Sequence, residues 1–127
     1  MDGLEISQRD VRGVTVLDLS GRLVLEDGVD MFLERMNQLR HKGHRWILLN
    51  FDRITYLDSA GVGAIASRYV SARKRDGDVK LLHLRPKTHT VLKTTKLLTV
   101  LESFESEEEA IESFLVERDD DTNPIFT

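Results

Sequence analysis

The sequence predicts one α/β domain with a mixed central β-sheet of about four to five strands and about four helices packed on it. Its 127 residues, 40% of them hydrophobic, suffice for one core and are too few for two. After two opening strand-like segments, helical and strand-like segments alternate along the chain. Residues 46–51 are apolar almost throughout, as is typical of a central strand covered on both faces.

The first third of the chain predicts a hairpin and a helix. Residues 4–7 alternate in polarity, turn residues follow, and residues 14–19 then predict a second strand that ends at Gly21. From about Asp27 to a stop at Gly43, hydrophobic residues recur at the spacing of a helix. These residues are Val29, Phe32, Leu33, Met36 and Leu39.

After the apolar strand, a second helix is predicted to begin at Asp58 or Ser59 and to end before Gly77. Its expected buried positions are Val62, Ile65, Ala66 and Tyr69. Trp46, Tyr56 and Tyr69 have apolar neighbours and are predicted to belong to the core.

The last third predicts a strand over residues 79–84, a short helix over residues 88–96 after Pro86, and a short strand over residues 100–104. Ser106 and Glu109 have the spacing of a capping box and predict the start of a final helix. We therefore predict a domain over residues 1–117 and an acidic, flexible tail over residues 118–127.

Composition excludes several functions. The chain has no cysteine, which rules out disulfides and thiol catalysis and fits a reducing compartment. A formal net charge of −4 argues against nucleic-acid binding. No signal-like segment and no run of about 20 apolar residues is found, so the expectation is a soluble cytoplasmic protein with no membrane contact.

The most informative segment is Asp58-Ser59-Ala60-Gly61-Val62-Gly63. It puts a hydroxyl beside a carboxylate on the first turn of a helix, where backbone N–H groups are unpaired and carry partial positive charge. The small residues around Ser59 leave its hydroxyl open to a large partner. The segment therefore suits the attachment and removal of a phosphate, although an N-terminal cap is the commoner use of such a residue.

This segment, together with Leu19-Ser20-Gly21-Arg22-Leu23 upstream, resembles the STAS domain of bacterial anti-sigma-factor antagonists. The resemblance extends over residues 4–115 and implies a single STAS-like domain. It implies that Ser59 is phosphorylated by an anti-sigma factor that is itself a serine kinase, and that a serine phosphatase restores it. The segment from Asp58 to Gly63 would bind the partner, with no catalytic residue, cofactor or metal. Two positions depart from the family pattern: Ala60 replaces a second serine, and Val24 replaces an aspartate.

Three alternatives stay open at this stage. A STAS domain could instead be a scaffold subunit of a signalling or transporter-associated complex, with Ser59 only capping a helix. Gly61, Gly63 and Ala66 fit the weak G-x-G-x-x-A form of a dinucleotide fingerprint, with Arg85 after the next strand, but Asp58 would lie beside the pyrophosphate. His41 and His44 have a metal-ligand spacing, although their cationic neighbours favour a solvated helix end.

Overall fold

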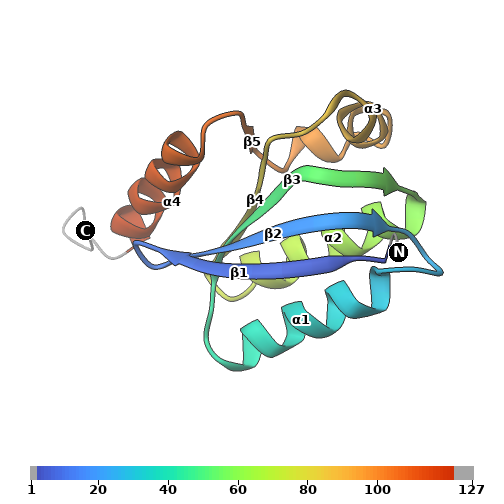
Figure 1. Ribbon diagram of the computed structural model, residues 1–127. Coiled ribbons are helices and arrows are strands. Elements are labelled where there is room, and N and C mark those ends of the chain that lie inside the picture. The colour runs from blue at the N-terminus through green and yellow to red at the C-terminus, as the bar shows by residue number, and fades with distance from the viewer. Residues whose placement is uncertain (1–2, 122–127) are drawn as a thin grey trace.

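The structure is a computed structural model that describes residues 3–121, in which a five-stranded sheet is packed by four α-helices (Figure 1). The predicted α/β class is confirmed. The elements, in chain order, are β1 (Glu5–Val11), β2 (Val14–Leu23), α1 (Val29–His41), β3 (Trp46–Leu57), α2 (Ser59–Arg73), β4 (Asp78–Leu82), α3 (Pro86–Thr94), the 3₁₀ helix η1 (Leu97–Thr99), β5 (Ser103–Phe104) and α4 (Glu107–Asp121).

The sheet follows the order of the chain, β1-β2-β3-β4-β5. β1 and β2 form an antiparallel hairpin, and all later neighbours are parallel, so the sheet is mixed as predicted. Because parallel strands run in one direction, the ends of β2 and β3 and the starts of α1 and α2 lie at one end of the molecule (Figure 1). The opposite end holds the last turns of α1 and α2.

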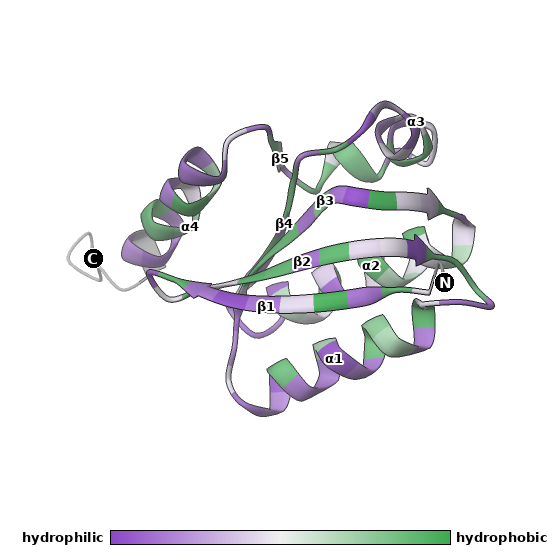
Figure 2. Cartoon of the chain, in the orientation of Figure 1, coloured by the Kyte–Doolittle hydropathy of each residue, from purple (hydrophilic) through white to green (hydrophobic). Residues whose placement is uncertain are grey.

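Hydrophobic residues cover both faces of the sheet. On one face α1 and α2 pack over β2, β3 and β4, and Leu92, Leu97 and Leu101 after β4 join the same cluster. On the other face α4 packs Phe114 against Trp46, with ring centroids 6.4 Å apart in an edge-to-face arrangement. Each helix carries hydrophobic and hydrophilic residues, as expected when only one side is buried (Figure 2). None of the helices within residues 3–121 combines the length and apolarity needed to cross a bilayer.

Three strands extend beyond their predicted ends, and the first of them, β1, continues to Val11. The prediction that Gly21 ends the second strand is wrong. Gly21 lies within β2 with a φ of 103°, and the strand continues to Leu23. Register shifts against β3 on both sides of Gly21 accommodate the irregularity. β3 likewise continues to Leu57, and its last residues pair with β2 but not with β4.

The final helix is longer than predicted. α4 continues to Asp121, so the predicted boundary at residue 118 falls inside it, and the rest of the predicted tail lies outside the described residues. Ser106 caps this helix as predicted, since its hydroxyl accepts a hydrogen bond from the N–H of Glu109 at 3.3 Å.

Charged residues are buried where α4 meets β4. The Lys80 ammonium lies 3.2 Å from a carboxylate oxygen of Glu117 and 3.2 Å from one of Glu102, and 4.7 Å from the centroid of the Phe114 ring. Asp78, 6% exposed, faces Glu117 and Arg73. These three carboxylates have the spacing of metal ligands, but two of them share the Lys80 ammonium as an ion-pair partner.

This cluster predicts a pH-dependent stability. Burial raises the pKa of Asp78 to about 7, and the neighbouring Glu117 carboxylate adds to the effect. In the unfolded chain the pKa is about 3.9. The folded protein therefore holds a proton that the unfolded chain has lost, and stability falls as pH rises towards 7. We expect the unfolding free energy to fall by about 2 kcal/mol between pH 5.5 and 8, and expect Asp78→Asn to remove most of this fall.

Urea denaturation at the two pH values would measure this change. Asp76→Asn is the matched control, because it makes the same chemical change two residues away, at an exposed position. The fall should persist in Asp76→Asn. Equal falls in wild type and Asp78→Asn would show that another group is responsible.

Candidate functional site

The start of α2 is fixed by Asp58, which stands between β3 and the helix. Its backbone is extended, and its Oδ1 accepts a hydrogen bond from the N–H of Gly61 at 2.9 Å, which makes it the N-cap. Its Oδ2 accepts a second hydrogen bond, at 3.0 Å, from the N–H of Leu25 in the loop after β2. One carboxylate thus joins the helix start to the neighbouring loop.

Ser59 is the first residue of α2, and its side chain is exposed. Within residues 3–121 its hydroxyl has no hydrogen-bond partner, because both oxygens of Asp58 are bound to backbone N–H groups. Asp58 therefore caps the helix, and the hydroxyl of Ser59 is left open. A phosphate on Ser59 would lie at a helix N-terminus, where partial positive charge favours an anion.

The two glycines of the segment differ in their surroundings. A Cβ on Gly61 would lie 2.2 Å from the carbonyl oxygen of Leu23, so only glycine lets α2 approach the end of β2 this closely. A Cβ on Gly63 would meet nothing within 4 Å. Ser59 and Gly63 are four residues apart and therefore lie on one face of the helix, which is exposed.

The predicted partner-binding segment is thus divided between surface and interior. Ser59 and Gly63 are exposed, Asp58 and Ala60 are partly buried, and Gly61 and Val62 are buried. A partner that docks here would touch Ser59 and Gly63, while Gly61 and Val62 hold the helix on the sheet.

Two exposed hydrophobic side chains near this turn were not predicted as part of the site. Leu25, whose N–H is bound to Asp58, is 66% exposed. Tyr56, three residues before Ser59, is 57% exposed, so its predicted place in the core is wrong. The physical reason is that β3 has lost its neighbour β4 at this point, and the ring lies instead between the Arg22 guanidinium carbon, 5.2 Å from its centroid, and the Lys87 ammonium at 5.7 Å.

The site carries a fixed negative charge. Desolvation opposes ionisation of Asp58, but the N–H groups of Leu25 and Gly61 outweigh it and hold the pKa of Asp58 below its usual value. Asp58 is therefore ionised at neutral pH. A phosphate on Ser59 would add about −1.5 to −2 next to this charge.

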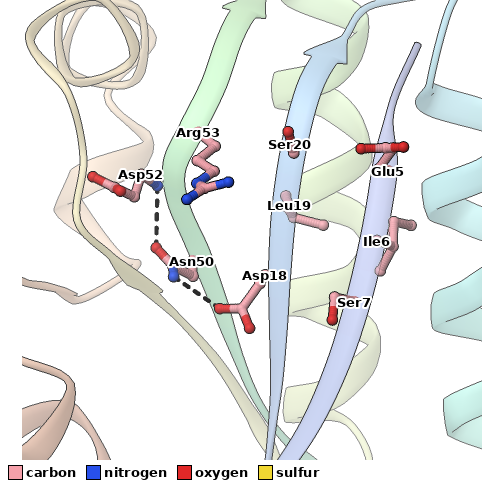
Figure 3. Close-up of a pocket in the computed structure, with 9 residues that line it drawn as sticks. All are labelled: Glu5, Ile6, Ser7, Asp18, Leu19, Ser20, Asn50, Asp52 and Arg53. Atoms are coloured by element: carbon pink, nitrogen blue, oxygen red, sulfur yellow. Dashed lines mark hydrogen bonds between the residues drawn. The ribbon is translucent and has the colours of Figure 1, made fainter.

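The residues that would form a dinucleotide site do not have the arrangement that such a site needs. Gly61 lies against a carbonyl oxygen rather than an open cradle, and Arg85 pairs with Asp52 at 3.4 Å, which argues against the dinucleotide alternative. A separate polar cavity of about 610 Å³ lies over β1, β2 and β3, which supply its lining residues (Figure 3). There the Asn50 amide donates to Asp18 at 2.8 Å, and Asp18 is also paired with Arg9, so these two polar groups of the cavity already have partners.

The fold and the site together define a class of small α/β domains in which an exposed serine begins the second helix. The chain belongs to the STAS domain family, whose model matches residues 6–110. It is 28% identical over 110 residues to an anti-sigma F factor antagonist of Paenibacillus polymyxa, which covers 85% of this chain and 92% of that protein.

Solved structures share the fold. The anti-sigma factor antagonist SpoIIAA in its unphosphorylated form is 25% identical, with a TM-score of 0.73 over 86% of this chain and 95% of that one. The phosphorylated form of SpoIIAA from Bacillus is also 25% identical and gives a TM-score of 0.67 over 86% of this chain and 98% of that one. The murine anion transporter Slc26a9 is 10% identical, with a TM-score of 0.70 over 91% of this chain and 22% of the transporter, which is a likeness of fold alone.

Proposed function

We propose that this chain is a cytoplasmic anti-sigma-factor antagonist that works as a phosphorylation-controlled binding switch and not as an enzyme. The observation that carries the proposal is the exposed, unpartnered hydroxyl of Ser59 on the first turn of α2. The 28% identity to an anti-sigma F factor antagonist supports it. The partner would be an anti-sigma factor with serine kinase activity, and docking would release a sigma factor.

In the unphosphorylated state, docking would use the surface around Ser59. The exposed face of α2 at Ser59 and Gly63 carries only small residues, so a partner can approach the helix backbone. Leu25 and Tyr56 supply apolar area close to this face. Tyrosine is among the residues that most often dominate binding energy at protein interfaces.

In the phosphorylated state, the fold would persist but docking would fail. The helix N-terminus favours the added charge within the protein itself. A partner covering the same turn would have to desolvate a phosphate that lies next to the ionised Asp58. A loss of about 1.4 kcal/mol already weakens binding tenfold. A serine phosphatase acting on Ser59 would restore docking.

The proposal is tested by mapping phosphate. The protein is incubated with ATP and the candidate anti-sigma kinases encoded in the same genome, and modified peptides are identified by mass spectrometry. We expect a single phosphate on Ser59, and none on the Ser59→Ala variant. Ser67→Ala is the matched control, because Ser67 is also an exposed serine of α2. Phosphate on Ser67 or elsewhere, with Ser59 unmodified, would contradict the proposal.

The scaffold alternative keeps one supporting observation, which is that the same fold occurs within a membrane transporter. In that case Ser59 would remain unmodified by every such kinase, and Ser59→Asp would bind its partner as the wild type does.

A further inference from the structure

A second cavity, of about 210 Å³, lies at the other end of α2, between the last turns of α1 and α2 and the start of β3. Of the ten residues within 3–121 that line it, five are basic and none is acidic, although the chain has a net charge of −4. The basic residues are Arg40, His44, Arg45, Arg68 and Arg75.

The helix ends do not account for these arginines. Cations are common in the last turn of a helix because they neutralise its free carbonyls. Here backbone N–H groups already occupy them: Gly43 donates to Arg40 at 3.0 Å and Gly77 donates to Ala72 at 2.8 Å. Arg68 lies more than a turn before the end of α2 and donates to Asn37 of α1 at 2.8 Å.

The arginines also lack anionic partners. Within residues 3–121, none of the four arginines of the cavity forms an ion pair. The Nε of Arg40 is buried and has no hydrogen-bond partner in the same part of the chain. Such an atom is costly to bury unless a ligand or water satisfies it.

We propose that this cavity binds a small molecule carrying a phosphate monoester. Guanidinium groups present fixed pairs of donors that match phosphate oxygens, and partial burial strengthens such bonds. The other lining residues include Met36, Ile47 and Ala72, so the cavity also suits a short apolar body attached to the phosphate. His44, which forms the H-x-x-H pair with His41, is one of the lining residues. Its Nδ1 lies 2.6 Å from the hydroxyl oxygen of Thr15, so this ring nitrogen already has a hydrogen-bond partner.

The cavity is separate from the switch proposed above, because its lining residues in α2 belong to the second half of the helix, whereas Ser59 is the first residue of α2. The proposal of a ligand site in this cavity therefore does not depend on the phosphorylation of Ser59. A ligand here touches α1, α2 and β3 together, so its binding also stabilises the fold, by an amount that grows with the logarithm of the ligand concentration above Kd.

The experiment titrates the ¹⁵N-labelled full chain with inorganic phosphate and with ethyl phosphate, at fixed ionic strength, and follows amide NMR signals. We expect saturable shifts at Gly43 and Ser71 in the cavity and none at Ser59. Ethyl phosphate should bind more tightly than inorganic phosphate, by about fourfold per buried methylene. The double variant Arg40→Gln/Arg75→Gln should lose at least about tenfold in affinity.

The matched control is Lys42→Gln/Lys74→Gln, which removes the same charge from neighbouring exposed positions that do not line the cavity. It should change the affinity by less than about threefold, because exposed charges that do not contact the ligand are largely screened by solvent and salt. Equal losses in the two double variants would overturn the proposal in favour of nonspecific attraction. Vesicles containing phosphatidic acid and a single-stranded oligonucleotide are tested in parallel. Binding to either of these without saturable binding of ethyl phosphate would also overturn it.

Discussion

Ser59→Asp is expected to weaken binding to the cognate anti-sigma factor by about tenfold to a hundredfold, with no loss of fold stability. The substitution puts a permanent negative charge on the exposed first turn of α2, beside the ionised Asp58. Within the protein the charge lies at a helix N-terminus and is tolerated. Against a docked partner the two carboxylates must be desolvated together, and the cost appears only in the complex.

The informative control is Ser59→Asn, which has nearly the shape of aspartate but no charge. It should keep most of the affinity, and Ser59→Ala should keep it as well, if charge rather than size blocks docking. Isothermal titration calorimetry with the purified partner gives the affinities, and urea denaturation gives the stabilities. An Asn variant as weak as the Asp variant would mean that Ser59 is merely crowded by the partner and that the switch is not electrostatic.

Much of the fold could be predicted from sequence because local signals and burial agree. Residues 46–51 predicted a central strand and form the middle of the sheet. The end of β3 was missed because the polar residues Asp52 and Arg53 interrupt its apolar run. The end of β2 was missed because a glycine inside a strand is read as a stop. Gly21 lies where the register between β2 and β3 shifts, and this shift is set by the pairing of the two strands. Such long-range register has no local sequence signal.

The same distinction applies to the site. The exposure of Ser59 could be predicted because it follows from the place of this residue at a helix start, which the local sequence indicates. The exposure of Tyr56 could not be predicted, since it depends on where β4 ends relative to β3. The basic cavity was equally hidden, because Arg40 and Arg75 are far apart in sequence and meet only when α1 and α2 pack. Sequence showed a basic helix end but not an enclosed volume.

Gly61→Ala is expected to destabilise the protein by about 2 kcal/mol, although alanine is the better helix former. The new Cβ would lie 2.2 Å from the carbonyl oxygen of Leu23 and 2.7 Å from Cδ1 of Leu57. The first contact is with backbone, so the helix start must move away from β2. That movement also strains the hydrogen bond from Gly61 to Asp58 and, through the other oxygen of Asp58, the link to Leu25.

Gly63→Ala makes the comparison decisive, since it is the same change two residues later in the same helix. Its Cβ meets nothing within 4 Å, so only the helix propensity changes, and stability should rise by up to about 1 kcal/mol. Urea denaturation of the two variants should therefore show shifts of opposite sign. Because the start of α2 carries Ser59, Gly61→Ala should also weaken partner binding beyond what its lost stability explains. Equal stabilities for the two variants would mean that α2 is not fixed against β2 at this glycine.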